Sequence, residues 1–561
     1  MSAPRITRGF AWNHLYKLVE FGGVNLYAIM VARAFGPEVG GNYAVFLSIS
    51  GTLAIMGAFA VDGVLLRYLP RILHGERTFG EAKVEGIRPF LIELLAFRLF
   101  INLFLALLVF LVLGVLPNYS AGMATSLSGI RQLWPYYVVF LIAQTGVAFS
   151  TFTLIGLLQV KWVFYASIIG RLSLLGIGAI LLATGQLSIE GAIALFVFAS
   201  LLIACVLLYW VHHHVEQESS QGLRVEFANF RRRLMGFISK PTRVRIFLLM
   251  PFMLYGITTW GSDVLSTVLG RQPDILMMRA LLGQNARDIG LYDAAARLAL
   301  MTEYILLFGL GGTLVSVFSE FAQQDERKSA EVVGVVSDRM KYHRLLKARK
   351  DIAGYQTVST APLFAFMLAF APLVLEVIYG GKFAGALHMM VVSLILQSIM
   401  VIVFGGGMQV TSLVTIGKER VVFVNRLAWG LLNLIANYFL IQRYGGLGAM
   451  IGTQTAGVCV IATESILAAR WVGQSLRPVR SASIVAIAAA SALLTYYGVG
   501  FLSTTIPAMI RLLAGGAGMA ILTLSSYALF RIPEARKAWG KIRSLAGIPE
   551  DRDDKPASLS A

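Results

Sequence analysis

The sequence has few charged residues and almost no cysteine. Asp, Glu, Lys and Arg together make up 14% of its 561 residues. Such a low charged fraction excludes an ordinary soluble protein. Cys205 and Cys459 both lie in apolar runs. We expect these two thiols to be packing residues, and they carry no information about the redox compartment.

Motifs of the common membrane enzymes are also missing. The sequence has no P-loop lysine motif and no soluble catalytic domain, which excludes an ATP-driven exporter unless a partner supplies the ATPase. A glycan polymerase or an O-acyltransferase would need a larger external loop than that at residues 117–132. Three consecutive histidines at residues 212–214 point in different directions around a helix, so neither a metal site nor a cofactor is expected. The sequence therefore indicates a protein that is not an enzyme.

Long apolar runs dominate what is present. Hydrophobic residues make up 57% of the chain, and its mean hydropathy is +0.72. Fourteen apolar windows follow one another at residues 11–34, 41–66, 89–116, 133–158, 163–184, 187–211, 246–279, 289–318, 357–379, 383–415, 421–442, 447–473, 479–502 and 506–530. Each is long enough to cross a bilayer as a helix, some only when tilted or broken. The first run has no cleavage site after it and is expected to be retained. We predict an all-α integral membrane protein with about fourteen transmembrane helices.

Lys and Arg alternate between the loops on the two sides of these windows. If the amino terminus is cytoplasmic, most of the 48 Lys and Arg residues fall in cytoplasmic segments. The opposite loops keep Arg131, Arg287, Lys382 and Arg443. This is the positive-inside pattern, and it predicts that both termini are cytoplasmic. The net charge of +18 is therefore explained by topology and by contact with membrane lipid, and a nucleic-acid partner is not expected.

The second half of the sequence weakly repeats the first. Gly283 and the segment Gly290-Leu-Tyr292 correspond to Gly36 and the segment Gly41-Asn-Tyr43. A repeat of six helices keeps its orientation in the membrane, so the two halves should be related by a pseudo-twofold axis along the membrane normal. We predict an N-lobe at residues 1–211, a basic cytoplasmic connector at 212–245, a C-lobe at 246–475 and two appended helices within 476–530. The tail at residues 531–561 is polar and is expected to be disordered.

Charged residues inside the windows predict the site. A charged group at the bilayer centre costs roughly 3 kcal/mol, so such groups usually face a pathway for substrate or ions. Five deep cations occur in both halves and predict a cationic cavity: Lys17, Arg171, Arg271, Arg297 and Arg426. Six acids could couple transport to an ion or pair with nearby arginines: Glu20, Asp62, Asp263, Asp274, Asp293 and Glu464. Guanidinium groups match phosphate oxygens, so a phosphorylated cargo is expected.

One stretch of the seventh window concentrates these charges. Read as a continuous helix, Asp263, Arg271 and Asp274 lie on one polar stripe together with Ser266 and Gly270. Pro273 lacks an amide proton and should loosen the helix within this stripe. Two further pairs fit helical spacing, Lys17 with Glu20 and Asp293 with Arg297. We expect the seventh helix to form one wall of the transport path.

Three segments, taken in order, resemble a known family. They are Ala32-Arg-Ala-Phe-Gly-Pro-Glu-Val-Gly-Gly-Asn-Tyr-Ala44 with Leu66-Arg-Tyr68, then Asp274-Ile-Leu-Met-Met with Gly290-Leu-Tyr-Asp-Ala-Ala295, and Gly417-Lys418 with Leu440-Ile-Gln-Arg-Tyr-Gly-Gly-Leu-Gly-Ala449. Over residues 10–475 the chain resembles the Wzx-type polysaccharide flippases of the multidrug/oligosaccharidyl-lipid/polysaccharide (MOP) exporter superfamily. The long basic loop at residues 323–350 departs from the usual pattern of that family.

The resemblance implies a function in surface polysaccharide synthesis. Two six-helix lobes would alternate access to a central cavity in the bacterial inner membrane and move an undecaprenyl-diphosphate-linked oligosaccharide, driven by an ion gradient. Implied partners are a polysaccharide polymerase and chain-length or export proteins, and the loop at residues 323–350 is a candidate contact. The alternatives within the superfamily are a lipid II flippase and an ion-coupled multidrug exporter. A membrane glycan polymerase or acyltransferase is the alternative from a different class.

Overall fold

A computed structural model describes most of the chain. The described residues are 3–73, 78–79, 82–83, 87–115, 131–157, 159–218, 256–257, 259–283, 285–307, 343–405, 408–472, 479–502, 506–530 and 532–536. Most of the predicted basic connector, most of the loop at residues 323–350 and nearly all of the predicted disordered tail lie outside these residues. The contacts divide the chain into two compact units, which are described one at a time below.

Unit 1 comprises residues 1–297, 308–310 and 420–456. Its first half contains α1 (Ala3–Phe35), α2 (Pro37–Ala58), α3 (Val61–Leu73), β1 (Thr78–Phe79), β2 (Ala82–Lys83), α4 (Ile87–Val109), η1 (Phe110–Val115), η3 (Arg131–Leu133), α6 (Trp134–Gly156), α7 (Val160–Ala183) and α8 (Ile189–Glu218). It then continues with a helix at residues 259–268, α11 (Arg271–Leu281), the first half of α12 (Ala286–Leu307) and the first part of α18 (Glu419–Val472). The strands β1 and β2 form a two-residue antiparallel ribbon.

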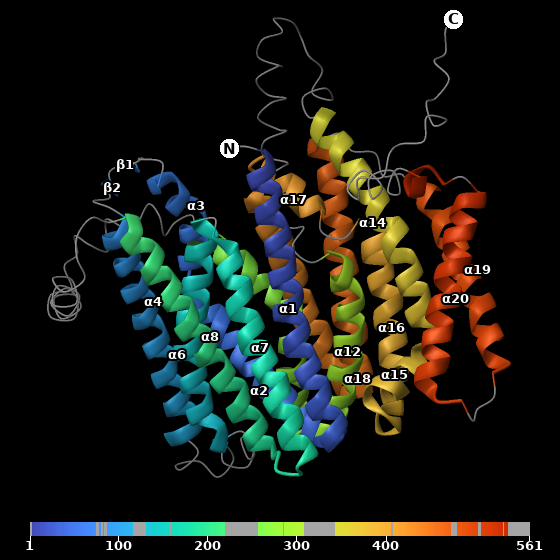
Figure 1. Ribbon diagram of the computed structural model, residues 1–561, viewed down its shortest axis with the longest axis horizontal. Helices are drawn as coiled ribbons and strands as arrows, with labels where there is room; N and C mark the ends of the chain where they lie inside the picture. The colour runs from blue at the N-terminus through green and yellow to red at the C-terminus, as the bar shows by residue number, and fades with distance from the viewer. Residues whose placement is uncertain are drawn as a thin grey trace, which may run out of the picture. The chain divides into compact units, whose positions relative to one another are not determined.

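Unit 2 comprises residues 298–307, 311–419 and 457–561. Its described elements are the end of α12, α14 (His343–Ala369), α15 (Ala371–Tyr379), η4 (Gly381–Ala386), α16 (Leu387–Ser398), η5 (Ile399–Val403), α17 (Met408–Thr415), the end of α18, α19 (Val479–Gly500) and α20 (Ala508–Leu529). In this unit α19 lies beside α14 and α20 (Figure 1). Gly515 of α20 lets the Phe370 ring approach so closely that a Cβ would lie 2.7 Å from it.

The predicted all-α membrane fold is confirmed. Within the described residues, eleven helices are long and apolar enough to cross a membrane. One of them, α18, joins two of the predicted windows, and every one of the fourteen windows contains helix. The chain is therefore a multi-pass helical membrane protein, and the number of fourteen spans stays a prediction. The lobes predicted at residues 1–211 and 246–475 also stay a prediction.

Close pairs of helices build unit 1, and small residues set their spacing. The helices α1 and α7 run side by side, as do α6 and α8 (Figure 1). A Cβ on Gly146 of α6 would lie 3.0 Å from the methyl group of Ala204 on α8. The ring of Phe46 on α2 stacks on Tyr137 of α6 at 4.9 Å between centroids. Without a hydrophobic force between helices in lipid, such close backbone packing is a main source of stability.

The span predicted at residues 41–66 as one helix is broken in the structure. The helix α2 ends at Ala58 and α3 begins at Val61. Phe59 and Ala60 between them have φ angles of 26° and 69°. These angles are unusual for residues with a Cβ, so the surrounding structure must hold the break in place.

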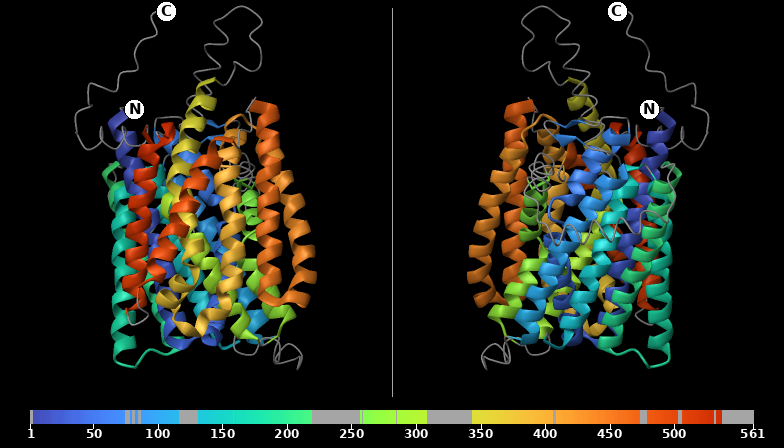
Figure 2. Two further views of the ribbon diagram at one scale, coloured as in Figure 1. Left: turned by 90° about the vertical axis from the view of Figure 1, so that its right-hand side faces the viewer. Right: turned by 90° about the vertical axis from the view of Figure 1, so that its left-hand side faces the viewer.

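The long helix α18 is a hairpin of two helices. Its backbone leaves the helical conformation at Gly445, with φ 58° and ψ −136°, and Figure 2 shows the two arms meeting at one end. Gly448 and Gly452 lie on the second arm, where a Cβ would overlap the backbone carbonyl of Leu440 or the side chain of Asn437. The missing side chains at Gly448 and Gly452 therefore allow the two arms of α18 to pack in direct contact.

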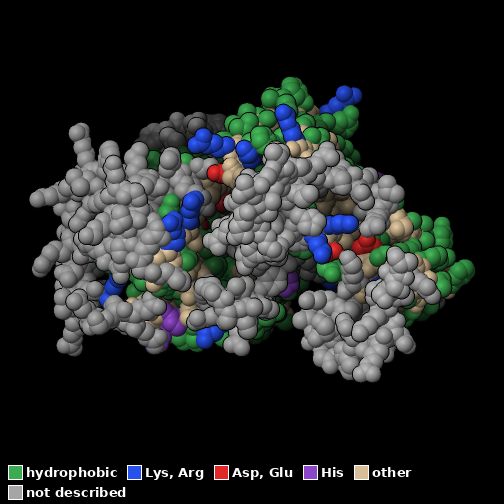
Figure 3. Space-filling model, turned by 90° about the horizontal axis from the view of Figure 1, so that it is seen from above, with side chains coloured by type: hydrophobic (Ala, Val, Ile, Leu, Met, Phe, Trp, Pro, Cys, Tyr) green, Lys and Arg blue, Asp and Glu red, His purple; other side chains and the backbone are tan. Residues whose placement is uncertain are grey.

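In the end-on view of Figure 3, Lys and Arg side chains are visible at several separate places, next to hydrophobic side chains at the edges of the view. The predicted orientation, with both termini cytoplasmic, stays a prediction.

Candidate functional site

The seventh window is not one continuous helix, so the prediction of a single polar stripe from Asp263 to Asp274 is wrong. Residues 259–268 are helical, Gly270 has an extended backbone (φ −109°, ψ −175°), and α11 starts at Arg271. Pro273 falls in the first turn of α11, where a missing amide proton costs no helical hydrogen bond. The break therefore occurs at Gly270, and it re-aims Arg271 and Asp274 relative to Asp263.

Two of the predicted cations meet on one carboxylate. Arg297 Nε donates to Asp293 Oδ2 at 2.6 Å, and Arg271 Nη1 lies 3.1 Å from Asp293 Oδ1. Arg297 Nη1 also donates to Asn25 Oδ1 at 2.8 Å, which links α12 to α1. The Arg297 side chain is 2% exposed and that of Arg271 is 18% exposed. Arg297 is thus a buried anchor, while Arg271 is the member of the pair that reaches toward solvent.

A third predicted cation is paired with an acid from α1. Arg171 on α7 forms a two-pronged ion pair with Glu20, with Nε 3.1 Å from Oε2 and Nη2 bonded to Oε1. Gly23 lies directly against the Arg171 stem, where a Cβ would come within 2.7 Å. Glu20 therefore forms its ion pair with Arg171, and it also interacts electrostatically with Lys17, the partner that helical spacing predicted. Lys17 is half-buried, with its Nζ 5.2 Å from the Tyr16 ring centroid.

The remaining charges of unit 1 form a more exposed group. Arg426 on α18 is half-buried, and its Nη1 donates to Ser266 Oγ at 2.5 Å. Asp263 interacts electrostatically with Arg426 and with Asp62. The Asp62 side chain is 22% exposed and pairs with the buried Arg98. Three of the predicted charges thus come together at an accessible surface.

Asp274 occupies a different environment from these pairs. It is fully buried, and its carboxylate accepts hydrogen bonds from the hydroxyls of Tyr292 and Thr453 and from the amide of Asn437. The bonds from Asn437 and Thr453 measure 2.8 Å. Asn433 adds a bond to Thr453 at 3.2 Å, and the buried Oδ1 of Asn437 has no hydrogen-bond partner. We call Asp274, Tyr292, Asn433, Asn437 and Thr453 the Asp274 cluster.

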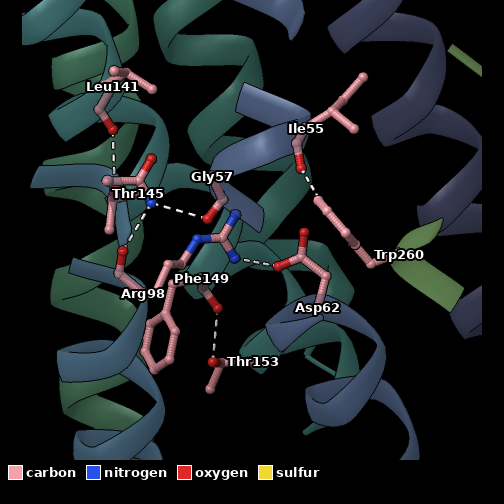
Figure 4. Close-up of polar contacts among 10 residues, drawn as sticks. Ile55, Gly57, Asp62, Arg98, Leu141, Thr145, Phe149, Thr153 and Trp260 are labelled. Carbon is pink, nitrogen blue, oxygen red and sulfur yellow. Dashed lines mark hydrogen bonds and ion pairs between the residues drawn. The ribbon is translucent and has the colours of Figure 1, made fainter. Parts of the chain in front are cut away.

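Side chains from neighbouring helices hold the break between α2 and α3 (Figure 4). Asn102 on α4 donates its amide to the backbone oxygen of Gly57 at 2.9 Å, and Trp260 donates Nε1 to that of Ile55 at 2.8 Å. These are carbonyls that a broken helix leaves without an intrahelical donor. The Asp62–Arg98 ion pair closes the same region on the α3 side. The break is thus a built feature with its own polar partners.

Sequence reasoning found the charges but missed some of their partners. Glu464, the sixth predicted acid, is buried in unit 2. Asn25, Arg98, Asn102 and Trp260 were not among the predicted site residues. Uncharged polar residues within apolar windows are the signal that could have found Asn25 and Asn102. No group of three or more metal-binding side chains occurs in the described part of the chain.

Solved structures resemble this chain, whereas protein-family models and curated proteins do not. No protein-family model matches the sequence, and no curated protein matches it either. Among solved structures, the lipid II flippase MurJ in an inward closed conformation superposes with a TM-score of 0.59 at 14% identity, over 92% of this chain and 99% of that one. An inward-facing MATE family multidrug resistance transporter of the MOP superfamily gives 0.57 at 13% identity, over 82% and 94%. The chain shares the fold of these two structures.

A third structure of this fold comes from Pyrococcus furiosus. It is a MOP superfamily transporter that matches with a TM-score of 0.51 at 15% identity, over 85% of this chain and 96% of that one. The reverse polarity of its binding pocket suggests a different function for that protein. All three are described as flippases or transporters. At these identities the likeness establishes the fold alone.

Proposed function

We propose that this chain flips an undecaprenyl-diphosphate-linked oligosaccharide across the bacterial inner membrane by alternating access, coupled to an ion gradient. The observation that carries the proposal is the group of arginines inside unit 1. Arg171 pairs with Glu20, and Arg271 and Arg297 both pair with Asp293. Guanidinium groups gathered among apolar helices favour an anionic cargo over a cationic one.

The contacts divide the roles among these arginines. Arg171 and Arg297 are almost fully buried in ion pairs, so we assign them to holding the site in shape and to setting its charge. Arg271 is the most exposed of the three and starts α11 at the Gly270 break, so we assign it to contact with the diphosphate. A guanidinium binds two phosphate oxygens at once, which suits this task better than an ammonium group. Lys17 and Arg426 are both half-buried, and we assign them to contact with the cargo on entry.

Ion coupling is assigned to the Asp274 cluster. Asp274 accepts hydrogen bonds from three neutral donors, whereas Glu20 and Asp293 are paired with guanidinium groups. The unpartnered Asn437 oxygen lies in the same cluster. Carboxylate, amide and hydroxyl oxygens suit either a proton on Asp274 or a small hard cation among these groups. Binding or release there would act on α11, whose first residue is Arg271.

The polarity of the site separates this proposal from drug export. In the Pyrococcus furiosus transporter of the same fold, reversed pocket polarity suggests a different function. By the same reasoning, arginines in unit 1 favour an anionic cargo in this chain and disfavour a cationic drug. A lipid II flippase would also carry a polyprenyl diphosphate, and it stays the second candidate because MurJ superposes over nearly the whole chain. The loop at residues 323–350 is proposed to contact a polymerase or an export protein of the same pathway.

Deletion of the gene tests the proposal directly. We expect surface polysaccharide to be lost and lipid-linked oligosaccharide to accumulate with its sugar facing the cytoplasm. Accumulation of cytoplasm-facing lipid II would favour the second candidate. Unchanged glycans together with altered drug sensitivity would overturn both.

A point variant tests the assigned contact. Arg271→Ala should abolish export while the protein stays in the membrane, because its partly exposed side chain is the proposed contact with the diphosphate. Arg443→Ala is the matched control, since Arg443 is exposed on the α18 hairpin and lies over the Tyr444 ring. Export at the parental rate in Arg271→Ala would remove Arg271 from the site.

A further inference from the structure

Two glycines bring α2 and α12 into backbone contact. A Cβ on Gly41 would overlap the backbone oxygen of Ala286 and would lie 3.0 Å from the backbone nitrogen of Gly290. A Cβ on Gly290 would overlap the backbone oxygen of Pro37 and would lie 3.0 Å from the backbone nitrogen of Gly41. Both glycines are buried. The contact is therefore reciprocal. Gly41 packs against Ala286, four residues before Gly290, and Gly290 packs against Pro37, four residues before Gly41.

These glycines are equivalent positions of the internal repeat. Gly41 and Gly290 each stand two residues before a buried tyrosine, Tyr43 and Tyr292. Both lie in the first turns of helices that follow loops predicted to face away from the cytoplasm. A contact between equivalent residues lies on the axis that relates two repeats. Motion of one repeat against the other would therefore open or close this crossing.

The crossing lies close along the chain to the charged residues of the site. Asp293 and Arg297 follow Gly290 within two turns of α12, and Tyr292 bonds Asp274. On α2 the residue seven positions after Gly41 is Ser48, on the same face and 1% exposed. When α2 and α12 are in contact at the two glycines, they would shield Ser48, Asp293 and Arg297 from solvent on the side away from the cytoplasm.

We propose that the Gly41–Gly290 crossing is the outer gate of the transport path, and that it closes only because both positions lack a side chain. The inference rests on the proposed transport function, but not on the identity of the cargo. A methyl group at either position overlaps backbone, so no side-chain rearrangement relieves it. The helices must then separate, and the closed state is disfavoured.

The test uses a cysteine as a reporter of opening. Cys205 and Cys459 are replaced by serine, and Ser48→Cys is added as a nearly isosteric thiol. Intact spheroplasts are then treated with a membrane-impermeant maleimide from the outside. In the parental chain the thiol should react slowly, because Ser48 is buried when the crossing is closed.

Gly41→Ala and Gly290→Ala should each speed this reaction by about tenfold or more and should stop export of the lipid-linked glycan. A tenfold shift of the gate toward the open state corresponds to about 1.4 kcal/mol. Gly176→Ala is the matched control, since a Cβ there would meet nothing within 4 Å. Adding Ala286→Gly should not rescue Gly41→Ala, because the overlapping atom is a backbone oxygen.

Unchanged labelling in both variants would overturn the proposal. If both variants are absent from the membrane, the Ser48→Cys chain with native glycines decides the question. In that chain the thiol at position 48 must react faster with the maleimide while export is running than when cargo synthesis is blocked. Equal reaction rates under the two conditions would overturn the proposed gate. If the proposed cargo is wrong, Gly41→Ala and Gly290→Ala should still speed labelling of the thiol. Failure of the proposed function and failure of the gate are therefore distinguishable.

Discussion

Replacing Asp274 by Asn removes a charge from the core while keeping the shape of the side chain. In the structure its two oxygens accept three hydrogen bonds, two of them at 2.8 Å from Asn437 and Thr453. An asparagine could keep those two bonds through its oxygen if its amide turns toward the Tyr292 hydroxyl. The hydroxyl proton of Tyr292 then loses its acceptor. We expect a cost of about 1–3 kcal/mol in the free energy of unfolding, typical of one unsatisfied buried group.

The expected loss of function is larger than this change in stability implies. If Asp274 couples transport to an ion, Asp274→Asn should reduce export by about 5- to 150-fold, the range of a coupling free energy of 1–3 kcal/mol. Unfolding of the purified protein is followed in sodium chloride and in choline chloride at the same ionic strength, and at several pH values. The coupling ion at 100 times its Kd should raise the free energy of unfolding of the parental chain by about 2.7 kcal/mol. That of Asp274→Asn should not change.

Asp288→Asn is the matched control for this experiment. Asp288 is on α12, half-buried, and accepts a bond from Asn285 at 3.2 Å outside the Asp274 cluster. It should export at the parental rate and keep the ion response. Parental export together with an undiminished ion response in Asp274→Asn would refute the coupling role of the cluster.

Two further predictions concern stability. Arg297→Leu should lower the free energy of unfolding by about 3–5 kcal/mol, because Asp293 and Asn25 would lose a buried partner. Detergent-solubilised protein should melt at a lower temperature than the parental chain, and an equal melting temperature would contradict this. Asn102→Leu should cost about 1–3 kcal/mol, since the backbone oxygen of Gly57 at the α2 break loses its donor. Its melting temperature should fall, whereas retention of parental stability would show that another group satisfies that carbonyl.

The sequence by itself determined the class of the protein and the windows of its helices. Apolar runs of bilayer length leave little choice of structure, because only helices satisfy every backbone group within lipid. Three of the charged residues predicted in those runs also contact one another, since Arg271 and Arg297 both pair with Asp293, whereas their role in a transport site stays a prediction. The i,i+4 pair of Asp293 and Arg297 was predictable because it depends on helical spacing alone.

Only the tertiary structure decided how the helices break and which groups meet across them. The break at Gly270 and the one at Phe59 and Ala60 depend on neighbouring helices that supply donors such as Asn102 and Trp260. Helical spacing favoured Lys17 as the partner of Glu20, yet Arg171 from α7 takes that place. Hydrophobic periodicity fixes which residues avoid lipid, but the partner of a buried polar group is set by helix packing. That packing comes from contacts between residues far apart in the chain, and no local pattern records it.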